Sequence, residues 1–270
     1  MPYVSINDKK MHYLDQGSGP VLLFGHSFLW DHNMWREQVA VFSKNYRCIV
    51  PDLWGHGQSS PLSSETITIA QLGQDHLQLM DSLNVEKFSL IGLSVGGMWG
   101  AEVAIQAKAR LTALVMMDTF VGAEPEASKM RYFGMLDAVE KASCIPPPMI
   151  DALMPIFFSP NTLKNKPELV SEFRTRLSSY SPEQINSIVT LGRGIFSRDD
   201  RLAALAEIDI PTLILCGEFD QPRPVDEAKR MDDCCSRSEF KVVPGAGHIS
   251  CLESTDVVNA FLSDFLGAVS

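Results

Sequence analysis

The sequence predicts an α/β protein built on a doubly wound, mostly parallel sheet. Short apolar runs such as 21–24 and 111–117 have the composition of strands that are buried on both faces. Helical stretches separate these runs, and in 68–83 apolar residues recur at helical spacing. Strand and helix therefore alternate along the chain, as is typical of this fold class.

Short local sequence patterns predict each strand and helix. Tyr3–Ile6 and Lys10–Leu14 flank the turn-forming pair Asn7-Asp8 and predict an N-terminal hairpin. Later apolar runs end in glycine- or aspartate-containing loops, which puts polar side chains at the carboxyl ends of the strands. The eight predicted strands cover 3–6, 10–14, 21–24, 47–50, 85–91, 111–117, 210–216 and 239–243. The helices expected around this sheet cover 34–42, 68–83, 98–109, 224–233 and 252–266.

The alternation stops between residues 122 and 204. Four helical stretches follow one another there, at 130–140, 148–158, 166–178 and 182–192, with prolines 146 to 148 as a rigid connector. They carry more Met and Phe than a solvated pair of helices would. We therefore expect residues 122–204 to form an inserted helical cap, and residues 1–121 and 205–270 to form one α/β core.

Composition excludes several classes of protein. The net charge is −10 and basic residues do not cluster, which argues against nucleic-acid binding. No apolar run approaches the roughly 18 residues of a membrane span. The N-terminus lacks the pattern of a signal peptide, so we expect a cytoplasmic protein without a membrane partner. Six cysteines without a C-x-x-C pair do not indicate a disulfide framework.

The stretch Gly92-Leu93-Ser94-Val95-Gly96 lies where an apolar strand meets a helix. A side chain at such a corner needs a tight, strained turn, which glycines two residues to either side permit. This is the G-x-S-x-G pattern of a nucleophile elbow. It predicts Ser94 as a nucleophile.

A serine nucleophile needs a general base, and the base needs an anion that orients it. Asp220 and His248 each follow a predicted strand, which gives the order Ser94, Asp220, His248. Two other acids stay open for the orienting role: Asp118, which also ends a strand, and Glu218. We favour Asp220.

These motifs resemble the α/β-hydrolase superfamily over essentially the whole chain. Asp52 to Ser59 is similar to its D-x-x-G-x-G-x-S loop, 217–220 to its G-x-x-D acid loop, and 244–248 to its histidine loop. The resemblance implies an eight-stranded α/β-hydrolase sheet with a helical cap. Compact aryl esterases and cofactor-free haloperoxidase or perhydrolase-like serine hydrolases look most similar.

The resemblance also implies an oxyanion hole made by the backbone N–H groups of Phe28 and Val95. The segment before it departs from the family pattern, because Ser27 stands where relatives usually carry glycine. Leu29 stands where perhydrolase-type relatives tend to carry proline, which favours ester hydrolysis.

The cap is expected to line an apolar substrate pocket. The candidate pocket residues are Leu29, Met130, Phe133, Met154, Phe157 and Phe158. His26 and His56 flank the site and are expected to fix loops. His26, Asp31 and His32 lack the spacing of a zinc site, and no nucleotide-binding glycine motif is complete, so we expect neither metal nor cofactor.

We therefore expect a serine hydrolase that cleaves a small, apolar carboxylic ester or lactone through an acyl-enzyme. Carbon–carbon bond hydrolysis or perhydrolase/haloperoxidase-like activity on the same residues is one alternative. A ligand-sensing protein of hydrolase fold without catalysis is another. The physiological substrate and the oligomeric state do not follow from the sequence.

Overall fold

The computed structural model describes residues 2–62 and 66–269. Within that part of the chain the strands form one eight-stranded sheet in the order β1-β2-β4-β3-β5-β6-β7-β8. The strands are β1 (Tyr3–Ile6), β2 (Lys9–Gly17), β3 (Val21–Gly25), β4 (Arg47–Pro51), β5 (Phe88–Leu93), β6 (Leu111–Met117), β7 (Thr212–Gly217) and β8 (Ser238–Val243). β1 and β2 pair in antiparallel fashion, as does β2 with β4, and the remaining pairs are parallel. The doubly wound, mostly parallel sheet expected from the sequence is confirmed.

Successive residues of each central strand enter different cores, because side chains alternate across a sheet. In β3, Leu22 and Phe24 join the core that also holds Val39 and Leu262, whereas Leu23 joins the core that holds Leu72 and Trp99. The helices that cover the sheet are α1 (Arg36–Phe42), α2 (Ile69–Ser82), α3 (Val95–Ala107), α9 (Leu202–Leu205), α10 (Val225–Cys234), α11 (Ser250–Glu253) and α12 (Thr255–Val269), with the short 3₁₀ helices η1 (His32–Trp35) and η2 (Lys108–Arg110).

The continuous apolar runs form the central strands because both faces of the sheet are covered. β5 is buried at all six of its positions, and so is β7. The N-terminal hairpin turns at Asn7 and Asp8, both with positive φ (50° and 63°), a conformation that these two residue types tolerate.

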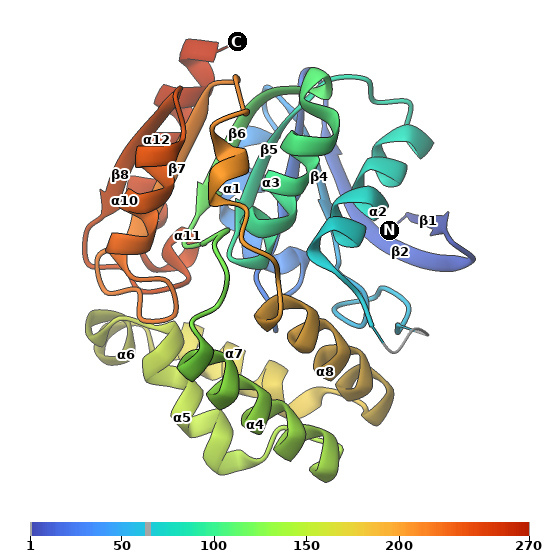
Figure 1. Cartoon of the computed structure of the whole chain (residues 1–270), viewed down its shortest axis with the longest axis vertical. Helices are drawn as coiled ribbons and strands as arrows, with labels where there is room; N and C mark the ends of the chain where they lie inside the picture. The colour runs from blue at the N-terminus through green and yellow to red at the C-terminus, as the bar shows by residue number, and fades with distance from the viewer. Residues whose placement is uncertain (1, 63–65, 270) are drawn as a thin grey trace.

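Five helices follow β6 and form a layer of their own: α4 (Glu126–Ala142), α5 (Pro147–Phe157), α6 (Pro160–Asn165), α7 (Pro167–Ser179) and α8 (Pro182–Phe196). We call these helices the helical layer. Figure 1 shows them together at one end of the sheet, below it in that view. Four of them match predicted stretches. The six-residue α6 was not expected, because a segment this short shows no helical periodicity. It forms because Ser159 caps it and Pro160 begins it.

None of the described helices is both long and apolar enough to cross a membrane.

Candidate active site

Ser94 lies in the turn between β5 and α3. Its backbone has φ 58° and ψ −121°, a strained conformation for a residue with a side chain. The turn closes only because its flanking positions are glycines: a Cβ on Gly92 would lie 2.2 Å from the Gly96 carbonyl oxygen, and one on Gly96 would lie 2.1 Å from that of Gly25. The steric reason for the G-x-S-x-G spacing is therefore visible in the fold.

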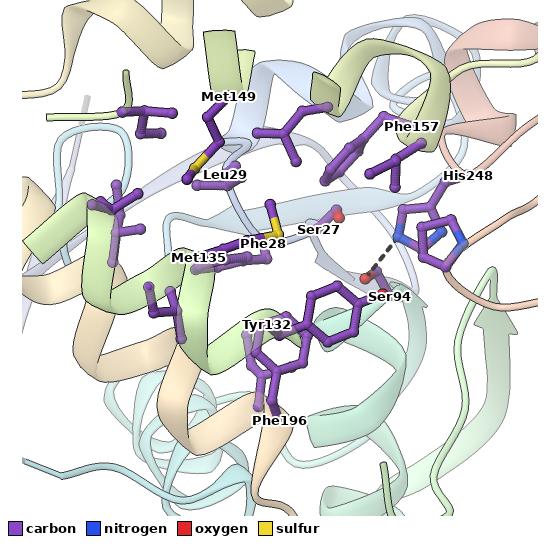
Figure 2. Close-up of a pocket in the computed structure, with 18 of the residues that line it drawn as sticks. Ser27, Phe28, Leu29, Ser94, Tyr132, Met135, Met149, Phe157, Phe196 and His248 are labelled. Atoms are coloured by element: carbon purple, nitrogen blue, oxygen red, sulfur yellow. Dashed lines mark hydrogen bonds between the residues drawn. The ribbon is translucent and has the colours of Figure 1, made fainter. Parts of the chain in front are cut away.

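His248 lies beside Ser94, at the end of the loop that follows β8. Its Nε2 atom is 3.0 Å from Ser94 Oγ, and its Nδ1 atom is 3.0 Å from each carboxylate oxygen of Asp220. The three side chains are buried, and they come from three strand ends. Figure 2 shows the Ser94–His248 hydrogen bond at the edge of a pocket. The structure thus brings together the three residues expected to react.

The two other acids have different partners. Asp118 accepts hydrogen bonds from the Gly217 N–H at 2.7 Å and from the Ser250 hydroxyl. Glu218 accepts one from the Gly245 N–H at 2.9 Å. Burial, and then the charge of nearby Asp220, raise the pKa of Asp118 well above its usual value. This shift favours the neutral form of Asp118, whereas Asp220 is the carboxyl group that faces His248.

The N–H groups of Phe28 and Val95 are the expected oxyanion donors. Val95 is the first residue of α3, where the backbone N–H has no carbonyl of its own helix to bond. Among the described residues neither N–H has a protein partner, whereas the next N–H in the loop, that of Leu29, donates to His56 Nε2 at 3.1 Å. Phe28 and Leu29 line the same pocket as Ser94.

Two buried histidines fix the loop that carries Phe28. His26 Nδ1 bonds the Ser27 carbonyl oxygen, and its Nε2 accepts the Leu53 N–H. In the same way, His56 Nδ1 bonds the Trp54 carbonyl oxygen, and its Nε2 accepts the Leu29 N–H. An Nε2 atom accepts a hydrogen bond only when the ring is neutral. Burial favours that form, since it lowers the pKa of His56 to about 3 and also lowers that of His26. The sequence-based view of both residues as loop-fixing groups agrees with these contacts.

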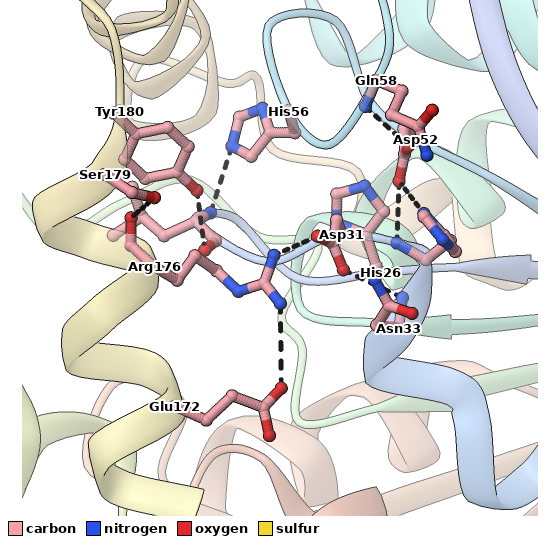
Figure 3. A network of polar contacts seen from close by, with 12 residues as sticks. His26, Asp31, Asn33, Asp52, His56, Gln58, Glu172, Arg176, Ser179 and Tyr180 are labelled. Carbon is pink, nitrogen blue, oxygen red and sulfur yellow. Dashed lines mark hydrogen bonds and ion pairs between the residues drawn. The ribbon is translucent and has the colours of Figure 1, made fainter.

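The helical layer holds the same loop from the other side. Tyr180, just after α7, donates its hydroxyl to the Leu29 carbonyl at 2.9 Å, and Arg176 pairs with Asp31 (Figure 3). The Trp30 ring stacks on Phe173 of α7 at 4.7 Å between centroids. Leu29 itself has φ 69°, so a strained residue has both of its backbone polar groups bonded. These contacts join residues about 150 positions apart in the sequence, and no sequence motif predicts them.

Within the described residues, two clusters have donor atoms close enough for a metal ion: His12, His32 and Asp52, and Asp118, Cys216 and Asp220. In the first, both Nδ1 atoms already bond Asp52, at 2.7 and 2.9 Å. Burial opposes its charge, but these hydrogen bonds hold the pKa of Asp52 well below its usual range. In the second, the carboxylates are bonded to His248, Gly217 and Ser250. Hydrogen bonds thus explain both arrangements.

The pocket beside Ser94 is almost entirely apolar and has a volume of about 100 Å³. Its wall combines the loop after β3 and the elbow with side chains from α4, α5 and α8. The residues are Ser27, Phe28, Leu29, Ser94, Met98, Tyr132, Met135, Leu136, Val139, Ile145, Met149, Leu153, Ile156, Phe157, Ile188, Ile195, Phe196, Pro222, Arg223 and His248. Arg223 pairs with Glu124 and Glu227, so the charge at the wall is compensated.

Of the six residues expected to line a substrate pocket, Leu29 and Phe157 line this cavity and the other four do not. Met130 points to solvent and is 69% exposed, and Phe133 is only partly buried and does not reach the wall. Met154 and Phe158 are buried in the core and do not line the pocket, and Phe158 packs against Trp30 and Phe173. On α4 the wall residues are instead 132, 135, 136 and 139. This i, i+3, i+4, i+7 spacing was available in the sequence.

Comparison with known proteins gives relatives along the whole chain. A family model described as the alpha/beta hydrolase fold matches residues 20–255. The chain is 26% identical to 3-oxoadipate enol-lactonase 1 of Acinetobacter baylyi, over 93% of this chain and 90% of that protein. It is 28% identical to 3-oxoadipate enol-lactonase 2 of the same organism, over 90% and 87%.

A solved structure of a thermophilic esterase from Thermogutta terrifontis superposes with a TM-score of 0.91. That protein is 27% identical, and the match covers 99% of this chain and 98% of the other.

Proposed function

The chain belongs to the α/β-hydrolase family, and from that premise we propose that it is a serine hydrolase that cleaves small, apolar carboxylic esters or lactones through an acyl-enzyme. The observation that carries the proposal is the contact of Ser94 Oγ with His248 Nε2 at 3.0 Å, with Asp220 behind the ring and an apolar pocket in front. The lactonase and esterase relatives support hydrolysis of esters or lactones.

The chemistry has two halves. Ser94 attacks the substrate carbonyl carbon while His248 Nε2 takes the hydroxyl proton, and the N–H groups of Phe28 and Val95 stabilise the oxyanion. The intermediate collapses, His248 returns the proton to the leaving alcohol, and the acyl group stays on Ser94. Water then attacks the acyl-enzyme while His248 takes its proton, and collapse of the second intermediate returns that proton to Ser94 Oγ and releases the acid. For a lactone the leaving alcohol is part of the same molecule.

The pocket favours an uncharged, apolar substrate portion. Its wall is formed by aliphatic, methionine and aromatic side chains, and the buried Arg223 already has two carboxylate partners. We propose that the helical layer acts as a cap that contacts this portion of the substrate.

Ester hydrolysis is favoured over perhydrolysis by the backbone at position 29. Leu29 has φ 69° and donates its N–H to His56. Proline has φ near −65° and no N–H, so it would not adopt this conformation. The oxyanion loop here therefore differs from the proline-containing loop of perhydrolase-like relatives.

The test is a hydrolysis screen over nitrophenyl esters of increasing acyl length, aryl esters and lactones, with a peracid assay from acetate and peroxide beside it. The expected result is ester or lactone turnover that Ser94→Ala abolishes. Turnover that survives in Ser94→Ala would refute the mechanism. Covalent labelling of Ser94 without turnover of any substrate in the panel would point to a ligand sensor instead.

A further inference from the structure

Ser27 places a hydroxyl without a hydrogen-bond partner in the wall of the reactive pocket. The residue is fully buried, and its Oγ atom has no partner in the described part of the chain. It lines the pocket together with Ser94 and His248, and Figure 2 shows it between Phe28 and the His248 ring. The family pattern has glycine here, so the hydroxyl is a feature of this chain.

Leaving such a group unpaired is unfavourable for folding. A buried hydroxyl without a partner loses its hydrogen bonds to water and gains none in return. The other fully buried serine hydroxyls are bonded; those of Ser159 and Ser250, for example, bond Thr162 and Asp118. Among the serines that the structure describes, Ser27 alone has a buried, unpartnered hydroxyl. Polar groups kept at such a cost are typical of functional sites.

The backbone holds Ser27 in a fixed position. Its carbonyl accepts hydrogen bonds from the Trp30 N–H at 3.2 Å and from His26 Nδ1 at 2.8 Å. The following residue is Phe28, whose N–H is one of the two proposed oxyanion donors. The hydroxyl proton of Ser27 can rotate, so it can turn toward a charge that develops beside Phe28. In an apolar pocket such a donor acts on that charge with little screening.

We propose that the Ser27 hydroxyl is a third donor to the oxyanion, beside the N–H groups of Phe28 and Val95. This inference rests on the proposed function, because the oxyanion forms only when Ser94 attacks a carbonyl. Ser27 binds the oxyanion more strongly than the neutral carbonyl of the bound substrate, and so acts on kcat more than on KM.

The experiment compares Ser27→Ala and Ser27→Gly with the wild-type protein. A trifluoromethyl ketone with an apolar chain serves as the transition-state probe: Ser94 Oγ adds to its carbonyl carbon, the Ser94 proton passes to His248, and the ketone oxygen becomes the anion. The corresponding alkyl amide is the ground-state probe. Ser89→Ala is the matched control, since Ser89 is on β5 away from the pocket and its hydroxyl bonds Thr112 at 2.7 Å.

Ser27→Ala is expected to lower kcat about 10- to 100-fold with little change in KM, and to weaken ketone binding by a similar factor while amide binding is retained. Because the unpaired hydroxyl is gone, its Tm is expected to rise by about 2 to 4 °C. Ser27→Gly is expected to lose kcat in the same way. Ser89→Ala should keep its activity and show no rise in Tm.

Unchanged kcat and ketone affinity in Ser27→Ala would overturn the inference and leave the proposed function intact. A parallel loss of amide binding, ketone binding and Tm would also overturn it, because that pattern is the effect of lost packing. A wild-type protein that neither turns over an ester or lactone nor forms the ketone adduct would refute the proposed function itself, and this inference with it.

Discussion

Replacement by asparagine should greatly lower the activity at one of the two buried aspartates near His248 and leave it almost unchanged at the other. In Asp220→Asn the amide oxygen is expected to stay on the Arg223 N–H, which Asp220 Oδ1 now accepts at 2.9 Å. The amide N–H₂ then faces His248 Nδ1 and stabilises the tautomer with its proton on Nε2. That nitrogen no longer accepts the Ser94 proton, so kcat should fall about 10⁴-fold, or roughly 5.5 kcal/mol.

Asp118→Asn should leave the activity almost unchanged. Burial and the charge of Asp220 raise the pKa of the Asp118 carboxyl, which favours its neutral form. An asparagine has the shape of that neutral acid. Its oxygen can accept the Gly217 N–H and its nitrogen can donate to Ser250, so kcat/KM should stay within about threefold of wild type.

The assay is kcat/KM for the best ester of the screen, measured from pH 6 to 9 for both variants. Thermal unfolding of each variant serves as the control for folding. An equal loss in the two variants, or a larger loss in Asp118→Asn, would refute the assignment of Asp220 as the residue that orients His248. Retained activity in Asp220→Asn would refute it as well.

Three further changes have expected outcomes. Tyr180→Phe leaves the Leu29 carbonyl without its donor and should lower kcat about tenfold with KM unchanged; steady-state kinetics on two esters test this, and a change in KM alone would contradict it. Burial lowers the pKa of His76 to about 4, so the unfolded chain takes up a proton from about pH 6.5 downward while the folded chain does not, and stability is lost as the pH falls. Urea unfolding of His76→Phe, which keeps a ring against Trp99, should show about 2.5 kcal/mol less of this loss at pH 4.5, and an unchanged slope with pH would count against it. Met149→Trp fills the pocket at the side away from Ser94 (Figure 2), and should lower kcat/KM for long-chain esters at least tenfold while acetate esters are spared. Equal losses for both esters would show that the substrate chain does not extend there.

The sheet and the meeting of the three candidate catalytic residues were predictable from sequence, because the signals for both are local. Strands that are buried on both faces appear in the sequence as continuous apolar runs. Parallel strands place the loops at their carboxyl ends at one edge of the sheet, so Ser94, Asp220 and His248 could be expected to lie close together. The sequence alone favoured Asp220 over Asp118 but left both open. In the structure Asp220 lies 3.0 Å from His248 Nδ1, whereas Asp118 bonds Gly217 and Ser250.

The pocket wall was less predictable, because it depends on how helices pack. Choosing residues of α4 by type alone selected Met130, which faces solvent, over Tyr132 and Met135, which face the pocket. The contact of Tyr180 with Leu29 joins residues 151 positions apart and has no motif. The orphan hydroxyl of Ser27 was visible only as a departure from glycine, since its lack of a partner is a property of the folded loop.

The most direct test is a search for the acyl-enzyme. The wild-type protein is mixed with an excess of the best ester, quenched with acid during turnover and examined by mass spectrometry of the intact chain and its peptides. The expected result is a mass increase equal to the acyl group, on the peptide that carries Ser94 and absent from Ser94→Ala. Ester turnover with no acyl adduct at any quench time, or an adduct on another residue that forms and decays at the rate of turnover, would contradict Ser94 as the nucleophile.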